Sequence, residues 1–171
     1  TGVSLRQNDT VTPLTIPRVS NFLIRASTVS SNRNSGIMLG FYNYSDALPL
    51  VPVVIDDCLI ENNLGVRGGG IAASAGDATP DRSTGIQIVK SLVKNNRSMA
   101  GSGGGVFLGP SQYPSISLSR IENNASGYNG GGVYFQASGT MNSCLVRGNS
   151  APLSGGGCYG GTLYHCTIID N

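Results

Sequence analysis

One phrase recurs along this chain of 171 residues, and its repetition restricts the fold to an array of similar units. Each copy has an aliphatic residue, two further positions, an asparagine, and then a glycine run that ends in another aliphatic residue. The asparagines of the six copies are Asn32, Asn63, Asn96, Asn124, Asn149 and Asn171. They are 22 to 33 residues apart. Self-similarity at such a period is the signature of a repeat architecture, and the variable spacing excludes a coiled coil.

Residues of fixed type flank each asparagine. Three positions before it the chain carries valine or isoleucine, such as Ile60 and Val93, and two positions earlier it carries serine or cysteine, such as Cys58 and Ser91. Because strand side chains alternate between faces with a period of two, both columns are predicted to face one interior. A third apolar column, which includes Ile55, lies three positions earlier still, and this spacing predicts a bend between two strands.

Each unit is too small to bury its own apolar face, so we expect the units to stack as coils of a solenoid. Equivalent residues of a parallel stack lie about 4.8 Å apart, so each column becomes a ladder. An inward asparagine at a sharp turn can bond backbone groups and the next asparagine amide, and it tolerates the left-handed conformation of such a turn. The glycines, as in 68–70, are expected to adopt positive φ and to permit close packing.

The asparagine column, the aliphatic columns and the repeat length resemble the right-handed parallel β-helix of the pectate-lyase-like superfamily. The Ile-x-x-Asn and Gly-Gly-Gly-Ile motifs are similar to repeats of polymorphic outer-membrane proteins and other bacterial surface adhesins, which carry Phe and Ala where this chain has aliphatic residues and glycine. The resemblance covers residues 22–171 and implies an all-β right-handed parallel β-helix of about six to seven coils. Residues 1–21 are an irregular N-terminal segment or a worn first coil.

Composition argues against a nucleic-acid partner and against a membrane span in this segment. Charged residues make up 12% of the chain, the net charge is +2, and lysines and arginines are scattered singly, so no nucleic-acid-binding patch is expected. The longest apolar run, 47–55, is much shorter than the roughly 20 residues that cross a bilayer. Residues 1–6 lack the features of a signal peptide, so we expect a mature chain or a piece of a longer one.

Few acidic residues are candidates for catalysis. The resemblance implies that related lyases and hydrolases use clustered outer carboxylates, some with Ca²⁺ or a basic residue. The nearest equivalent is the pair Asp56 and Asp57 with Lys90 one coil later, but neighbouring strand residues point to opposite faces. The column of Glu61 and Lys94 alternates in charge from coil to coil, which is typical of a solvated surface ladder. No catalytic residue, metal or cofactor is predicted.

The cysteines occupy repeat positions: Cys58, Cys144, Cys158 and Cys166. Their positions face the interior, so packed free thiols are the simplest interpretation. Cys144 and Cys166 would stack in adjacent coils at a distance compatible with a disulfide, which is the alternative. His165 is expected to point outward beside Ser143 without a third group to orient it, so a surface strand residue is favoured over a catalytic base.

The loop between the strand after the glycines and the next coil shortens along the chain, from residues 40–54 at first to 161–162 at last. Long loops on one side of a solenoid are a usual place for binding. A carbohydrate or a protein is the expected ligand, and a loop packed on its own coils is the alternative. The candidate binding residues in these loops are aromatic: Phe41, Tyr42, Tyr44 and Tyr113.

These features favour a non-catalytic extracellular or cell-surface protein that acts as a structural, adhesive or filament-forming element. The last copy stops at Asn171 without its glycines, which predicts either further coils of a longer chain or a homo-polymer joined through open coil ends. The alternative is a polysaccharide-active lyase or hydrolase, or a fragment of one. An enzyme of that kind would require outward carboxylates or basic residues clustered in adjacent coils.

Overall fold

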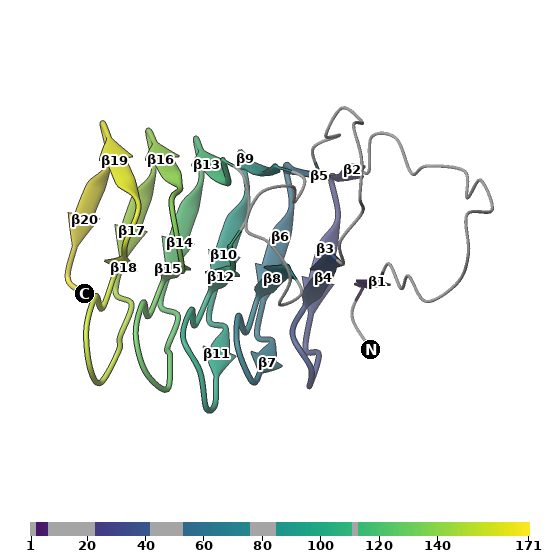
Figure 1. The fold of residues 1–171 in the computed structure, drawn as a ribbon, viewed down its shortest axis with the longest axis horizontal. Helices are drawn as coiled ribbons and strands as arrows, with labels where there is room; N and C mark the ends of the chain where they lie inside the picture. The colour runs from purple at the N-terminus through teal and green to yellow at the C-terminus, as the bar shows by residue number, and fades with distance from the viewer. Residues whose placement is uncertain (1–2, 7–22, 42–52, 76–84, 111–112) are drawn as a thin grey trace.

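The computed structural model describes residues 3–6, 23–41, 53–75, 85–110 and 113–171. These residues form short strands and turns, and no helix occurs among them. The coils are stacked along the long axis of the molecule, with the N-terminal strand at one end and the C-terminal coil at the other (Figure 1). The predicted all-β fold of stacked parallel coils is confirmed.

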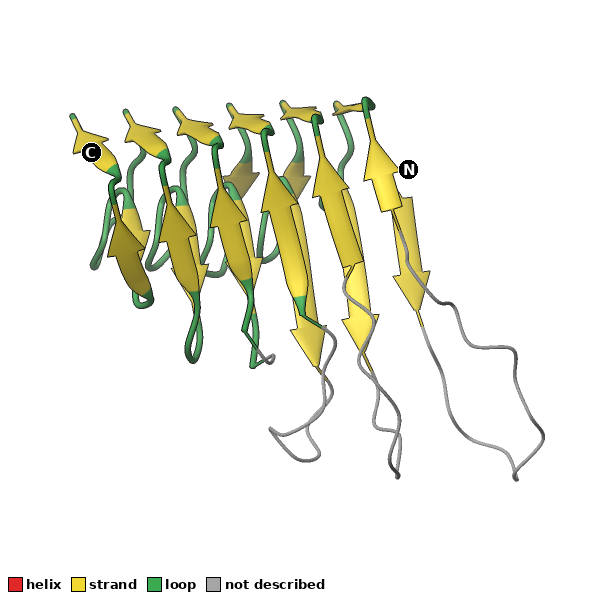
Figure 2. Cartoon of the chain, turned by 90° about the horizontal axis from the view of Figure 1, so that it is seen from above, coloured by secondary structure: helices red, strands yellow, loops and turns green. Residues whose placement is uncertain are grey.

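Three sheets run along the stack, and every strand pairing in them is parallel (Figure 2). The first sheet contains β2 (Leu23–Arg25), β5 (Val53–Asp56), β9 (Ile86–Val89), β13 (Ser115–Ser117), β16 (Thr140–Asn142) and β19 (Thr162–Tyr164). The second sheet contains β3 (Thr28–Ser30), β6 (Leu59–Glu61), β10 (Leu92–Lys94), β14 (Arg120–Glu122), β17 (Leu145–Arg147) and β20 (Thr167–Ile169). The third sheet contains β1 (Val3–Arg6), β4 (Ile37–Phe41), β8 (Ile71–Ala75), β12 (Val106–Leu108), β15 (Val133–Phe135) and β18 (Cys158–Tyr159).

A small fourth sheet joins β7 (Leu64–Gly65) to β11 (Arg97–Ser98) in the segment between the second and third sheets. At the N-terminal end of the stack, β1 pairs with β4 and places Val3 beside Ile37. Residues 3–6 therefore lie in the sheet formed by the strands that follow the glycine runs. The described residues contain no helix that is long and apolar enough to cross a membrane.

The core consists of aliphatic ladders contributed by all three sheets. Ile55 lies beside Ile88 in the first sheet, and Ile60 lies beside Val93 in the second. All four side chains are completely buried, as predicted. Burial of one such side chain stabilises the fold by roughly 1.5–3 kcal/mol. In the last coil, by contrast, Ile168, which belongs to the column of Ile60 and Val93, is 48% exposed.

A bend separates the first sheet from the second, as the spacing of three predicted. The bend residue has a left-handed backbone, with φ of 53° at Asp57, 49° at Lys90 and 50° at His165. These residues are therefore turn residues, and the prediction that Asp57 and His165 lie on strands was wrong. A side chain at the bend projects away from the coil because the chain changes direction there.

The asparagines form a continuous hydrogen-bonded ladder from Asn32 to Asn171. In a typical step, the side-chain Nδ2 of Asn96 donates to Oδ1 of Asn124 at 3.0 Å and to the carbonyl of Ile60 at 2.9 Å. The same Oδ1 of Asn124 accepts the backbone N–H of Asn96 at 2.9 Å. Each buried amide therefore satisfies backbone groups at a turn where strand pairing stops.

The turn at the ladder asparagine, which follows the second sheet, also contains a left-handed residue, and it is not the residue expected. The residue just before the ladder asparagine has positive φ, 55° at Asn62, 55° at Asn95 and 53° at Asn123. The prediction that the ladder asparagine itself adopts this conformation was wrong. Its side chain must point inward to reach the next coil, so the exposed residue before it makes the turn.

The glycine runs behave as predicted. Gly103 has a φ of 71°, a conformation that costs a side-chain-bearing residue more than glycine. A Cβ added to Gly104 would overlap the carbonyl oxygen of Gly131 and the backbone of Ala125 in the next coil. The first glycine of a run thus makes the turn, and the second permits close contact between coils.

Candidate functional site

The bend lies between Asp56 and Asp57, the acidic pair that most resembles the carboxylates of related enzymes. Oδ2 of Asp56 lies 2.8 Å from Nε of Arg25, in the coil before it. Asp57 is exposed at the bend, and the register places it beside Lys90, as expected. Asp56 and Asp57 point in different directions because the chain turns between them and not, as predicted, because side chains alternate along one strand.

The predicted alternation of charge in the second sheet is confirmed by the register, in which Lys94 lies between Glu61 and Glu122. Nζ of Lys94 is 3.2 Å from the Glu61 carboxylate. The Glu122 carboxylate is instead 2.7 Å from the guanidinium of Arg120, two residues away on the same strand. The ion pairs therefore do not form a continuous ladder, and each exposed pair contributes only about 0–1 kcal/mol.

All four cysteines are free, as the simplest interpretation expected. Burial raises the pKa of the Cys58 and Cys144 thiols above their ordinary value. Burial, with a smaller contribution from the neighbouring Cys166, raises the pKa of Cys158 to about 12. No group of three or more His, Cys, Asp or Glu side chains in the described ranges could hold a metal ion.

The serine and cysteine column forms a second polar ladder that the sequence prediction treated only as a row of small residues. Oγ of Ser119 accepts the backbone N–H of Ser91 at 3.1 Å and donates to the carbonyl of Ser117 at 2.7 Å. Oγ of Ser91 accepts the N–H of Cys58 in the same way.

At the outer surface, Ser143 and His165 are both exposed, and the Ser143 hydroxyl donates to Oδ1 of Asn142.

The candidate binding loops lie largely outside the described residues. Tyr42 and Tyr44 fall in the range 42–52, which the structure does not describe. Phe41 ends β4 opposite Ala75, and β5 begins at Val53, so the strands extend into the loop predicted for residues 40–54. Tyr113 is 82% exposed.

A different set of aromatic side chains is gathered on the outer face of the third sheet. Each belongs to the residue after the inward-facing one that follows a glycine run, so alternation directs it outward. The rings of Phe107 and Tyr134 are stacked with centroids 5.5 Å apart and planes at 5°. The rings of Tyr134 and Tyr159 continue the stack at 5.0 Å and 11°. The sequence contains this column, but our prediction considered only the loops.

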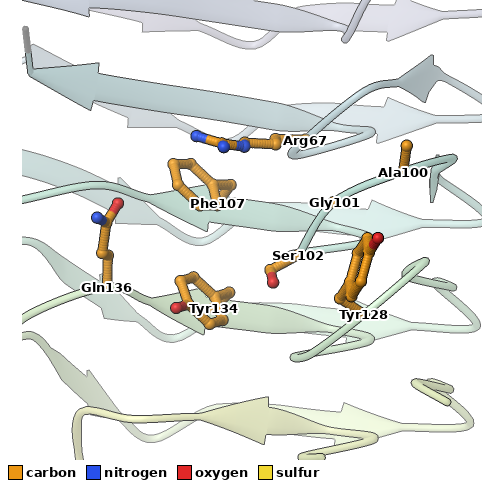
Figure 3. A pocket seen from close by; sticks show the side chains of 8 residues that line it. All are labelled: Arg67, Ala100, Gly101, Ser102, Phe107, Tyr128, Tyr134 and Gln136. Carbon is orange, nitrogen blue, oxygen red and sulfur yellow. The ribbon is translucent and has the colours of Figure 1, made fainter. Parts of the chain in front are cut away.

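A cavity of about 360 Å³ lies beside this stack, and we call it the aromatic groove (Figure 3). The Arg67 guanidinium lies across the face of Phe107, 5.6 Å from its centroid. Tyr128, half exposed, comes from the turn before the next glycine run and lies across the groove from Tyr134. The polar and aromatic side chains that line the groove are Arg67, Ser102, Phe107, Tyr128, Tyr134 and Gln136.

The turns between the asparagines and the glycine runs form one wall of the groove, and we call them the turn ridge. The turn ridge comprises residues 33–35, 64–67, 97–102, 125–129 and 150–154. Its segments are joined by backbone hydrogen bonds, from Gly127 N–H to the Gly101 carbonyl at 3.1 Å and from Leu153 N–H to the Tyr128 carbonyl at 3.2 Å. A Cβ on Gly101 would lie 2.5 Å from Cγ of Arg67, so the small residue leaves room for the arginine stem.

The described residues of the groove and the turn ridge carry positive charge and include no carboxylate. The ridge contains Arg33, Arg67 and Arg97, all exposed, and neither it nor the third-sheet strands contain an acidic residue. No carboxylate of a described residue lies within ion-pair distance of Arg67. Among the described residues, Arg67 therefore has no acidic ion-pair partner, and the groove has no acidic group of its own.

A family model described as a right-handed β-helix region matches residues 16–171 of the chain. This match agrees with the parallel pairing of all three sheets and supplies the handedness of the coils. No curated protein and no solved structure shows a significant match.

Proposed function

The chain belongs to the family of right-handed β-helix regions, and we propose that it acts as a non-catalytic, extracellular or cell-surface adhesive element that binds its partner in the aromatic groove. The observation that carries this proposal is the groove itself. It combines stacked aromatic rings, an arginine without a described carboxylate partner, and space for a ligand group. Such convergence of aromatic and polar groups at a cavity is typical of binding sites.

The scaffold supports this role because it holds the groove in one arrangement. Arg67, Ser102 and Tyr134 come from three successive coils. Each coil is joined to the next by in-register strands and by the asparagine ladder. A site on such ladders is preorganised, so less conformational entropy is lost when a partner binds.

Contacts of three described acidic residues favour a non-catalytic role over the alternative of a polysaccharide lyase or hydrolase. Two catalytic carboxyl groups would have to converge on a substrate at a set distance. Asp56 is instead engaged by Arg25, Glu61 by Lys94 and Glu122 by Arg120. Incubation with acidic polysaccharides should therefore produce no new unsaturated or reducing ends. Turnover that is abolished by Asp57→Asn would contradict the proposal.

Adhesion can be measured with beads that carry the protein and are washed over layers of cells. We expect bead retention to be at least about ten-fold lower for the double variant Tyr128→Ala/Tyr134→Ala, because it removes both phenol rings from the groove. Tyr113→Ala is the matched control, since it removes an exposed tyrosine outside the groove. Loss of retention in the control with none in the double variant would place the binding site on the loops instead.

A further inference from the structure

We propose that the partner bound at this site is a protein segment in which an acidic residue is flanked by aliphatic or aromatic residues, and that it docks across the turn ridge and the aromatic groove. This inference rests on the proposed function, because it names the partner of the same groove. It follows from the apolar side chains of the ridge, from the charge of this face and from the residue types that line the groove.

The turn ridge exposes large apolar side chains in consecutive coils. At least half of the surface of each is exposed, and none belongs to the core: Val66, Met99, Tyr128 and Leu153. The ridge hydrogen bonds place neighbouring segments side by side, including one from Met99 N–H to the Gly65 carbonyl at 2.8 Å. Exposed apolar side chains gathered beside a polar site mark protein interfaces. Aliphatic side chains such as Met99 and Leu153 favour a partner that brings apolar side chains of its own.

The positive charge of this face favours a partner that carries negative charge. Arg67 and Arg97 are exposed, and the described ridge contains no carboxylate that would neutralise them. A carboxylate of the partner could approach the Arg67 guanidinium while its neighbours contact the Tyr128 and Tyr134 rings. A guanidinium forms charge-assisted, bidentate hydrogen bonds with a carboxylate, so this contact would fix the register of the segment.

The residue types also favour a protein over a glycan. Tyrosine, arginine and methionine are the residues enriched at protein interfaces and their hot spots. The groove and ridge contain Tyr128, Tyr134, Arg67 and Met99 within three successive coils. A glycan would use the rings and the guanidinium but would leave the aliphatic row of the ridge unused.

A displayed library of random dodecapeptides, selected on the immobilised protein, tests the partner class. We expect selected peptides to be enriched in Asp or Glu beside Leu, Phe or Tyr, and the consensus peptide to bind more weakly as salt is raised. Arg67→Ala should weaken binding of this peptide at least ten-fold, about 1.4 kcal/mol. Leu153→Ser should weaken it several-fold. Arg120→Ala is the control, because Arg120 is an exposed arginine of the second sheet outside the groove, and binding should not change.

Arg67→Lys separates charge from geometry, since lysine keeps the charge without the planar fork, and we expect only partial recovery of peptide binding. Thermal unfolding of every variant shows whether the fold is intact. Peptides without acidic enrichment, or binding that is unchanged in Arg67→Ala, would overturn the inference.

The bead assay distinguishes this inference from the proposed function. Pre-treatment of the cell layer with protease should abolish retention, and periodate oxidation of its glycans should leave retention unchanged. Groove-dependent retention that survives protease and is lost after periodate would overturn the protein partner while the adhesive function stands. Retention that does not depend on Tyr128 and Tyr134 would overturn both.

Discussion

The buried asparagine shows how one residue can satisfy several backbone groups. Asn124 accepts the N–H and the Nδ2 of Asn96 through one oxygen, and its own Nδ2 donates to the Val93 carbonyl and to Asn149. Aspartate at this position would lack the donors, and alanine would lack both donor and acceptor. The preference for asparagine therefore comes from its amide, which carries donor and acceptor on one short side chain.

Replacement of a ladder asparagine should be costly. Asn124→Ala removes the acceptor of the buried Asn96 backbone N–H and the amide donor to the Val93 carbonyl, at about 1–3 kcal/mol for each group that stays dry. We expect the free energy of unfolding to fall by on the order of 3 kcal/mol in urea denaturation. The exposed Asn142→Ala should change it by less than about 0.5 kcal/mol. Equal effects of the two substitutions would contradict the role of the ladder.

The half-buried thiol of Cys158 should make stability depend on alkaline pH. Its folded-state pKa of about 12 lies above the ordinary value of 9.0 because burial disfavours the thiolate. A raised pKa contributes stability that is complete below the unfolded-state value and is lost as pH rises toward the folded-state value. We expect the urea midpoint to stay constant up to about pH 9 and to fall as pH rises from there toward 12, and to fall less in Cys158→Ala. An identical pH profile in this variant would contradict the expectation.

At the scale of the element, the turn between the second and third sheets combines two devices. A left-handed residue such as Asn123 turns the chain, and the glycine run returns it to the third sheet in close contact with the next coil. The strands between the turns have only two to five residues. Their position is therefore set mainly by in-register pairing with the neighbouring coils and by the turns at both ends.

The glycine at the centre of a run should be intolerant of a side chain. In Gly104→Ala the new Cβ would overlap backbone atoms of Gly131 and Ala125, which cannot rotate away. We expect a loss of about 3 kcal/mol, at the upper end of over-packing costs. Gly156→Ala is the matched control in the same column, since its Cβ would lie 2.9 Å from the nearest atom, and its cost should be smaller. A larger loss in the control would contradict this account, and urea denaturation measures both.

At the scale of the whole molecule, stability is a sum over coils and their interfaces, as in other solenoids. The same residue type therefore contributes differently at the centre and at the end of the stack. Ile121 is completely buried between neighbouring coils, whereas Ile168 of the same column is about half exposed.

The two positions make a matched pair. Ile121→Ala should lower the free energy of unfolding by about 2–5 kcal/mol, the usual range for a buried aliphatic side chain. Ile168→Ala should lower it by less than half as much because its transfer from water is incomplete. Guanidinium denaturation of both variants provides the comparison, and an equal or larger loss for Ile168→Ala would contradict the expectation.

The sequence by itself determined the repeated parts of the fold. Apolar columns such as that of Ile60, the inward asparagines and the glycine runs all reflect contacts between equivalent positions of successive coils. Those contacts can be predicted from the sequence alone, because stacking places each residue beside the equivalent residue of the next coil. The parallel solenoid could therefore be predicted, as could the interior position of Cys58 and the register of Glu61 with Lys94.

Only the tertiary structure decided the features that join unlike positions. The sequence did not show that Asn62 and not Asn63 turns the chain, or that Glu122 pairs with Arg120, because local geometry selects among neighbours. The aromatic groove is the clearest case. Arg67 lies in the turn ridge of one coil and reaches Phe107 on a third-sheet strand of the next. No repeat period relates these two positions, so their contact depends on the path of each turn in space.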